Sequence, residues 1–528
     1  MIATMRTSRT LAITHTLLTS LALSAQPAIE WQKCLGGTGT EFLYDLAKAA
    51  DGGYYVAGGT TSYDGDVTGY HGGGIPPYPD IWVVKLDSTS TIEWQKCLGG
   101  TNEERAYAIT GASDGGCLTV GYTWSNDGDV VGNHGSDAWV VRLDAAGGLV
   151  AQHFIGGAGG DVGRAIQGTS DGGFALAGST SSNDGDFSGN HGGVDGWVAK
   201  LDADAAVQWQ HCYGGSALDE LWSVQQTNDG GYVVAGRTYS NDGDVSGHHG
   251  SMDAWVLKLD GAGTILWQKC MGGNGDDEFR SAQQTSDGGF ILAGSTGSND
   301  GDVIGYHGDN DAWVVKLSAN GDLQWQKSLG GSQGDGGNAV RQTTDGGFIL
   351  TGGTTSNDGD VSGFHQGFGV SDAWVVKLND VGTLEWQKCL GGTSPESAHA
   401  IEETSAQHYV MAGYAWSNDG DVSGNHGGFD GWVVKLGLGE VGVVEEPRTP
   451  FTITPNPTRS TLTITLPRGP SVPEIVLMDA TGRTVMTQPT ATSTASLTLD
   501  LAGQESGMYL VQLRFADGTR AVERVVKE

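Results

Sequence analysis

The sequence predicts an all-β protein, a seven-bladed β-propeller followed by a small immunoglobulin-like β-sandwich. Three observations support this prediction. A motif that begins with Trp and Gln recurs about every 58 residues, each copy holds four short apolar runs, and residues 451–528 differ in composition from the rest. The 88 glycines fall at turns between apolar runs and lack the every-third-residue period of collagen.

The repeated motif is Trp-Gln-Lys-Cys-Leu-Gly-Gly. Each copy, as in residues 281–330, has four apolar runs joined by Asp-Gly-Gly and other short turns, which is typical of hairpins. Such units without a helical period predict a propeller, and a solenoid is the alternative. The motif starts at Trp31, Trp94, Trp209, Trp267, Trp325 and Trp386, with Ala151 in the same place in a degenerate copy.

The phase of the repeat predicts how the ring closes. The chain begins with a lone Trp-motif strand at 29–35, and its last copy stops after the third apolar run at 432–436. We expect the N-terminal strand to complete the last sheet, which would remove an exposed sheet edge. The propeller is predicted over 26–436, with a linker at 437–450.

The repeated tryptophans are expected to pack between neighbouring sheets, although aromatic faces can also stack on sugars. Trp124, Trp222 and Trp416 stand outside the repeated positions and are exposed candidates for ligand contact. The tryptophans expected within the third strands are Trp82, Trp139, Trp197, Trp255, Trp313, Trp374 and Trp432.

The N-terminal residues 1–25 read as a secretory signal peptide cut near Ala25. Two arginines precede an apolar stretch that ends in small residues. Export would permit disulfides, but five of the six cysteines occupy one equivalent place in separate repeats, and Cys117 stands where other copies have Phe or Tyr. We therefore expect all six to be small buried side chains.

The charge is strongly acidic, with 62 Asp and Glu against 28 Lys and Arg. This excess argues against nucleic-acid binding, which needs a basic face. After the signal peptide no apolar run reaches the ~20 residues of a membrane span. The long loops and the crossovers should emerge on one side and make an acidic face that attracts cations or basic partners.

Acidic loops between the second and third strands are candidate calcium sites. Oxygen ligands at positions 1, 3 and 12 around a Gly at position 6 resemble a twelve-residue Ca²⁺ loop, while Asp-Gly turns without metal are the alternative. The recurring loop histidines lack a second nearby His or Cys, so we expect hydrogen bonding rather than zinc or catalysis. The candidate ligands are Asp184, Asp186, Asp195, Asp242, Asp244, Asp253, Asp300, Asp302, Asp311, Asp419, Asp421 and Asp430, and the histidines are His71, His134, His191, His249, His307, His365 and His426.

Residues 451–528 carry several short strand-like runs and resemble the type A C-terminal sorting domain of the type IX secretion system of Bacteroidetes. The resemblance rests on Pro455-Asn456-Pro457, the segments 479–483, 497–501 and 506–513, and a basic end at Arg524 and Lys527. It implies Sec export, passage across the outer membrane by the type IX machinery, and release or surface anchoring. The repeat region is also similar to repeats of other exported Bacteroidetes proteins.

Three functions follow as hypotheses. The first is a non-enzymatic surface or secreted binding module that contacts a glycan, protein or cation through its acidic face, because near-identical loops suit multivalent contact. The second is an extracellular carboxylate-based hydrolase acting on polysaccharide, with a pair such as Asp276 and Glu278 as acid and base. The third is a structural unit that spaces other proteins.

Overall fold

The computed structural model describes residues 26–74, 77–133, 135–365, 370–437, 451–465, 474–479, 484–489, 496–514 and 520–528. The predicted signal peptide, His134 and residues 438–450 lie outside this part of the chain. Two compact units span Met1–Gly439 and Glu440–Glu528, and each is described by itself. Over the described ranges, no helix has the length and apolar character needed to cross a membrane.

The described residues of the first unit form seven four-stranded antiparallel sheets, each built from consecutive strands except at the closure. The first strands are β2 (Glu41–Lys48), β6 (Glu104–Gly111), β10 (Asp161–Gly168), β14 (Asp219–Gln226), β18 (Asp277–Gln284), β22 (Asp335–Gln342) and β26 (Glu396–Ser405). The second strands are β3 (Tyr54–Thr60), β7 (Cys117–Thr123), β11 (Phe174–Thr180), β15 (Tyr232–Thr238), β19 (Phe290–Thr296), β23 (Phe348–Thr354) and β27 (His408–Ala415).

The third and fourth strands complete each sheet toward its outer edge. The third strands are β4 (Asp80–Leu86), β8 (Asp137–Leu143), β12 (Asp195–Leu201), β16 (Asp253–Leu259), β20 (Asp311–Leu317), β24 (Asp372–Leu378) and β28 (Asp430–Gly437). The fourth strands are β5 (Ile92–Leu98), β9 (Leu149–Ile155), β13 (Val207–Tyr213), β17 (Ile265–Met271), β21 (Leu323–Leu329), β25 (Leu384–Leu390) and, at the closure, β1 (Ala28–Leu35).

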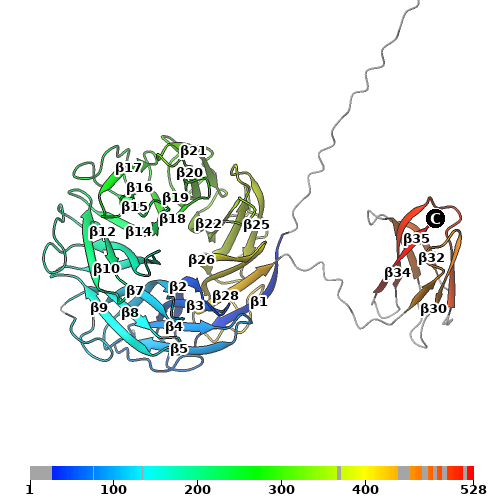
Figure 1. The fold of residues 1–528 in the computed structure, drawn as a ribbon, viewed down its shortest axis with the longest axis horizontal. Coiled ribbons are helices and arrows are strands. Elements are labelled where there is room, and N and C mark those ends of the chain that lie inside the picture. Colours follow the sequence, from blue (N-terminus) through cyan, green and yellow to red (C-terminus); the bar gives the residue numbers. More distant parts are fainter. Residues whose placement is uncertain are drawn as a thin grey trace, which may run out of the picture. The chain divides into compact units, whose positions relative to one another are not determined.

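The sheets form a closed ring of the propeller type rather than a solenoid (Figure 1). Each first strand contacts the first strand of the next sheet, from β2 through β6, β10, β14, β18, β22 and β26 back to β2. The first strands lie nearest the centre, and the fourth strands lie at the periphery. Residues on the seven inner strands can therefore converge on one central space.

The ring closes as predicted, by pairing of the N-terminal strand with the last sheet. β1 runs antiparallel to β28, with Gln32 opposite Val434 and Cys34 opposite Trp432. A regular sheet of order β1-β28-β27-β26 results. The edge of β28 is thus covered by a segment about 400 residues away in the sequence, which leaves no unpaired strand there.

The Asp-Gly-Gly turns have a specific structural role. In the sheet β14-β15-β16-β17, the buried Lys258 ammonium lies 2.9 Å from Oδ2 of Asp229 and also donates to the carbonyl oxygen of Leu259. A Cβ at Gly231 would lie 2.2 Å from that carbonyl oxygen, so only glycine fits there. The same lysine–aspartate pair recurs as Lys85–Asp51, Lys200–Asp171, Lys316–Asp287 and Lys377–Asp345.

The cores of the sheets confirm the predicted packing of the third-strand tryptophans. All seven are at most 1% exposed. Each belongs to an apolar cluster that includes residues of the neighbouring sheet, as Trp255 does with Ala177 and Val198. All six cysteines are free, and five are buried while Cys212 is partly buried, in line with the expected role as small apolar side chains.

The second unit contains two sheets around one core. A three-stranded sheet has the order β29-β30-β33 and a four-stranded sheet the order β32-β31-β34-β35. Leu462, Ile464, Leu477, Leu499 and Val511 are fully or almost fully buried between them. The strands are β29 (Thr452–Thr454), β30 (Thr461–Thr465), β31 (Glu474–Asp479), β32 (Thr484–Pro489), β33 (Ser496–Asp500), β34 (Gly507–Arg514) and β35 (Arg520–Lys527).

Candidate functional site

One residue of every inner strand is left out of the pairing register. In β2 the register shifts between Leu43 and Asp45, so Tyr44 forms a bulge against β3. A bulge re-aims a side chain and increases local twist, and it is common at sites of ligand contact. The equivalent bulged residues in the other sheets are Tyr107, Arg164, Trp222, Arg280, Asn338 and His399.

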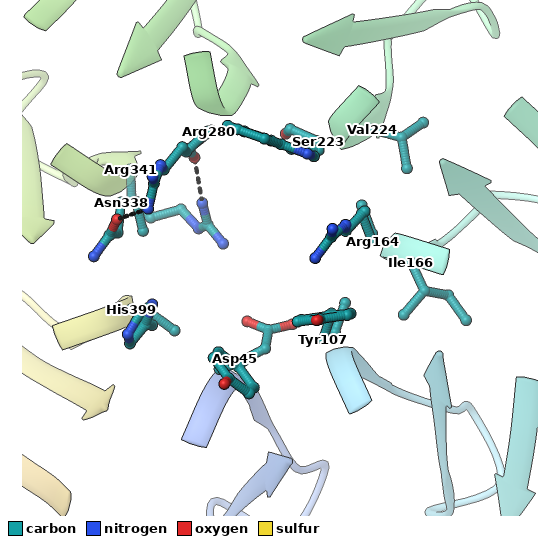
Figure 2. Close-up of a pocket in the computed structure, with 17 residues that line it drawn as sticks. Asp45, Tyr107, Arg164, Ile166, Ser223, Val224, Arg280, Asn338, Arg341 and His399 are labelled. Atoms are coloured by element: carbon teal, nitrogen blue, oxygen red, sulfur yellow. Dashed lines mark hydrogen bonds between the residues drawn. The ribbon is translucent and has the colours of Figure 1, made fainter. Parts of the chain in front are cut away.

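These bulged residues line a central cavity of about 370 Å³ (Figure 2). The cavity is also lined by Asp45, Ile166, Val224 and Arg341. A second cavity of about 620 Å³ lies next to the first, toward the C-terminal ends of the inner strands, and these four residues line it too. The centre of the ring is therefore hollow along much of the inner strands, with the shared residues between the two spaces.

One wall of the first cavity is aromatic. The rings of Tyr44 and Tyr107 lie 5.2 Å apart, and His399 meets Tyr44 edge to face at 5.4 Å. Phe42 stacks against Tyr44 at 6.3 Å. Arg105 donates a 3.0 Å hydrogen bond to the Tyr44 hydroxyl and holds it in place. This wall offers flat apolar surfaces with hydroxyl groups at their edges.

Basic side chains lie on and around this aromatic wall. The guanidinium of Arg164 lies 4.3 Å from the centre of the Tyr107 ring, and that of Arg280 lies 5.4 Å from the Trp222 ring. Arg280 also donates 3.0 Å to Oδ1 of Asn338, as Figure 2 shows. Arg341 lies deeper and donates 2.7 Å to Glu402. Cation–π stacking and these bonds hold the guanidinium groups in fixed positions.

Polar atoms without partners point to this cavity as a binding site. Within the described part of the chain, Nε of Arg164, Nε1 of Trp222 and Nε2 of His399 are buried and form no hydrogen bond. Buried polar groups are nearly always satisfied, and each one left unpaired costs about 1–3 kcal/mol. All three residues line the same space, so one occupant would contact all three side chains.

Asp45 and His399 have unusual pKa values in this environment. Burial raises the pKa of Asp45 to about 6, although its carboxylate accepts 2.8 Å hydrogen bonds from the backbone of Leu46 and Ile109. Burial, together with the charge of Arg280, lowers the pKa of His399 to about 4. His399 is therefore neutral at neutral pH. Among the residues that line this cavity Asp45 is the sole acid.

The predicted calcium ligands do not converge on a common point. In the loop 242–253, Asp242 accepts 2.7 Å from the backbone N–H of Ser216, Asp244 accepts 3.3 Å from Gly214, and Asp253 accepts from the backbone and Nδ1 of His249. In the other three loops, the aspartates accept hydrogen bonds from the equivalent groups. These aspartates are Asp184, Asp186 and Asp195, Asp300, Asp302 and Asp311, and Asp419, Asp421 and Asp430.

The donor set of these loops therefore does not fit the predicted ion. In the residues that the structure describes, no three His, Cys, Asp or Glu side chains are grouped to hold a metal. The Asp-Gly-Asp turn instead clamps the Gly-Gly of the Trp-Gln motif: a Cβ at Gly243 would lie 2.3 Å from the carbonyl oxygen of Gly214. The arrangement favours the alternative, a turn without metal, and the calcium assignment stays a prediction.

The loop histidines hydrogen-bond within their loops, as expected. Nδ1 of His426 lies 2.6 Å from Oδ2 of Asp430, which is fully buried. His71, His191, His249, His307 and His365 make the same contact with the aspartate that ends their own loop, at 2.7–3.1 Å. These histidines organise the junctions between sheets and do not line the cavity.

The three singled-out tryptophans separate into two groups. Trp124 and Trp416 are 59% and 48% exposed, as predicted. The ring centres of Trp416 and Phe429 lie 4.8 Å apart. Trp222 was expected at an exposed position but is partly buried and lines the cavity. Of the predicted catalytic pair, Glu278 binds Arg280 at 2.7 Å, and neither Asp276 nor Glu278 lines the cavity.

The cavity residues were not predicted as a group. The signal that reveals them is one column of the seven repeats, three residues after the acid that begins each first strand. That column reads Tyr, Tyr, Arg, Trp, Arg, Asn, His, whereas the columns on either side of it hold mostly small or apolar residues. A position that holds five residue types in seven sheets but points to one centre is the expected signature of a single asymmetric site.

Comparison with solved structures finds only remote likeness. A protein of unknown function from Dyadobacter fermentans is 11% identical with a TM-score of 0.40, over 78% of this chain and 99% of that one. Sqt1 from Chaetomium thermophilum is 11% identical with a TM-score of 0.41, over 78% and 100%. The extracellular domain of a putative hybrid two component system from B. thetaiotaomicron is 10% identical with a TM-score of 0.41, over 95% and 60%.

These likenesses carry no argument about activity, and no curated protein matches the chain. A family match is confined to the second unit. Residues 452–528 match the family described as "Secretion system C-terminal sorting domain". This agrees with the resemblance found in the sequence and with the two-sheet unit of the structure. The second unit is thus a type IX secretion sorting domain, and the chain is an exported protein that is attached to the outer cell surface or secreted.

Proposed function

We propose that this protein is an exported, non-enzymatic binding protein, in which a seven-bladed β-propeller captures a small molecule in its central cavity and an immunoglobulin-like sandwich directs export. The observation that carries the proposal is the convergence of seven bulged residues, of five different types, on one space. Three of them leave buried polar atoms without partners there. A cavity of this size is within the range of small-molecule sites.

The cavity supports binding better than the acidic rim, the face of the ring that carries the loop aspartates. On the rim, the loop carboxylates already accept hydrogen bonds from neighbouring backbone groups, although Oδ1 of the closing aspartates, such as Asp253, is also buried without a partner among the described residues. In the cavity, donors such as the Trp222 indole have no acceptor among the described residues. We therefore move the proposed site from the rim to the centre of the ring.

Binding is also favoured over hydrolysis. A carboxylate-based glycosidase uses two acids, about 5–10 Å apart, on either side of the bond that is cleaved. The first cavity provides Asp45 alone, and this carboxylate is tied to two backbone N–H groups of the inner strands. Glu402 lines the adjoining cavity, where its carboxylate accepts a hydrogen bond from Arg341. Hydrolysis remains the second candidate because the raised pKa of Asp45 suits a general acid.

A ligand screen with two matched tryptophan variants tests the proposal. Soluble oligosaccharides and small organic acids would be screened by thermal shift, and hits measured by calorimetry on Trp222→Ala and Trp416→Ala. We expect affinity to fall about tenfold or more in the first variant and to stay unchanged in the second. Loss in Trp416→Ala alone would place the ligand on the rim. Product formation that Asp45→Asn abolishes would favour the hydrolase.

A further inference from the structure

We propose that the ligand of the central cavity is an acidic sugar, a six-membered ring that carries a carboxylate. This inference rests on the proposed function and names the class of molecule that the cavity takes. Three features of the wall support it: an excess of donors, one guanidinium that is largely unengaged, and an aromatic surface that faces it. Each is argued from the contacts of the described residues.

The cavity has donors in excess of acceptors. Nε of Arg164 and Nε1 of Trp222 are N–H groups that can only donate, and both are buried without a partner among the described residues. Three arginines line the cavity, whereas Asp45 is the one acid on its wall and accepts from two backbone groups. An occupant that satisfies this wall must bring acceptor oxygens.

Arg164 is the guanidinium best placed to receive a carboxylate. Arg280 donates to Glu278 and Asn338, and Arg341 donates to Glu402, so both are engaged. Arg164 has no hydrogen bond to another described residue, and its nearest acid is Glu220 at 3.9 Å. Stacking on Tyr107 fixes the plane of the guanidinium and leaves its N–H edge open to the cavity (Figure 2). A guanidinium in a fixed plane binds a carboxylate with two parallel hydrogen bonds.

The aromatic wall suits a ring with an apolar face. Tyr44 and Tyr107 lie side by side with their ring centres 5.2 Å apart, next to the position of Arg164 over Tyr107. A sugar ring presents C–H groups on one face and hydroxyl groups at its edge. The C–H face can pack on the tyrosines, while the neutral His399 and the Trp222 indole meet the hydroxyl oxygens.

The size and charge of the site agree with this occupant. A volume of about 370 Å³ lies at the lower end of small-molecule sites, which suits one or two sugar rings rather than a polymer or protein segment. The chain as a whole carries a net charge of −34, so an anion would be repelled from most of its surface. Arginines gathered at the centre give the carboxylate one favourable position.

Calorimetry with matched acid and ester ligands tests this inference on the full chain. The probes are glucuronate, galacturonate and mannuronate as monosaccharides and disaccharides, together with their methyl esters, which keep the ring but lack the charge. We expect at least one acid to bind about tenfold or more tightly than its ester. Arg164→Gln should remove that preference, whereas Arg142→Gln, which changes an arginine outside the cavity, should leave it intact.

The outcomes separate the two proposals. An ester that binds as tightly as its acid, with both lost in Trp222→Ala, would keep the cavity as the binding site and overturn the acidic-sugar inference. Binding that Trp222→Ala and Arg164→Gln leave unchanged would overturn the cavity as the site as well. No binding by any of the acids would overturn the inference directly. Melting curves of all variants establish that each one is folded.

Discussion

The indole Nε1 of Trp432 donates a hydrogen bond of 2.8 Å to Oε1 of Gln32, a residue 400 positions away. The same bond joins the third and fourth strands of other sheets over only 13 positions, as between Trp313 and Gln326 at 2.9 Å. The closure therefore repeats a contact that is local elsewhere. This contact ties the first described strand of the chain into the last sheet of the ring.

Closure of the ring predicts that two distant glutamines contribute equally to stability. Gln32→Ala removes the bond to Trp432, and Gln326→Ala removes the equivalent bond to Trp313. Each loss should cost about 1 kcal/mol and lower the melting temperature by about 1 °C. Thermal unfolding followed by circular dichroism measures both. If Gln326→Ala lowers the melting temperature and Gln32→Ala leaves it unchanged, the N-terminal strand does not close the ring in solution.

The junction between Asp430 and Glu41 predicts a pH-dependent effect. Both side chains are fully buried, and both lie against Gly36, where an added Cβ would be 2.2 Å from Glu41 and 3.2 Å from Asp430. Burial and the charge of Glu41 raise the pKa of Asp430 to about 6. The stability that Asp430 contributes is therefore full below its unfolded pKa near 3.8 and is lost as the pH rises through about 6.

Asp430→Asn removes this loss. The melting temperature of the variant minus that of the unchanged chain should increase by about 3 °C from pH 4.5 to pH 8. Asp419→Asn is a control of opposite sign, because hydrogen bonds from Thr393 lower the pKa of Asp419. Asp419 contributes stability above its unfolded pKa, so its removal should become more harmful as the pH rises. A parallel response of the two variants would contradict the assigned environments.

The loop geometry predicts that calcium does not stabilise the ring. Asp242, Asp244 and Asp253 each accept hydrogen bonds from different neighbours and would have to give these up to coordinate an ion. The melting temperature in calcium should therefore equal that in a chelator. A binder of the folded state raises the melting temperature in a concentration-dependent way. Such a rise with calcium, absent with magnesium, would restore the calcium assignment.

The regular parts of the molecule were predictable because they repeat. The strand order, the burial of Trp255 and its equivalents, and the closure through Gln32 all follow from one pattern seen seven times. The central site was not, because a bulge breaks the two-residue alternation from which strand faces are read. Trp222 was expected to be exposed because it stands outside the repeated tryptophan positions, but the register shift at Trp222 turns its side chain to the centre.

The loop geometry could not be predicted from the sequence for a different reason. The spacing of Asp242, Asp244 and Asp253 matches a calcium loop, but spacing records only distance along the chain. The partners of the first two are Ser216 and Gly214, 26 and 30 residues earlier, in the segment that enters the same sheet. A carboxylate that already holds a distant backbone group is not available to an ion, and only the folded structure shows such a partner.

We expect that a solute can enter the middle of this acidic ring and that anions are repelled less strongly there than at the rim. Thiol labelling tests it without a known ligand. Asn338→Cys places a thiol on the cavity wall, and Tyr239→Cys places one at a position that is 41% exposed outside the cavity. Background is low because the native thiols are buried or partly buried, and burial raises the pKa of Cys212, the partly buried one, to about 12.

The measurement is the ratio of labelling rates for an anionic and a cationic methanethiosulfonate reagent, each normalised to a free thiol. Arg164, Arg280 and Arg341 should make this ratio several-fold higher at position 338 than at position 239. Arg164→Gln in the Asn338→Cys background should lower it. A ratio at position 338 equal to or below that at position 239, or no labelling there at all, would contradict an open, anion-accepting centre.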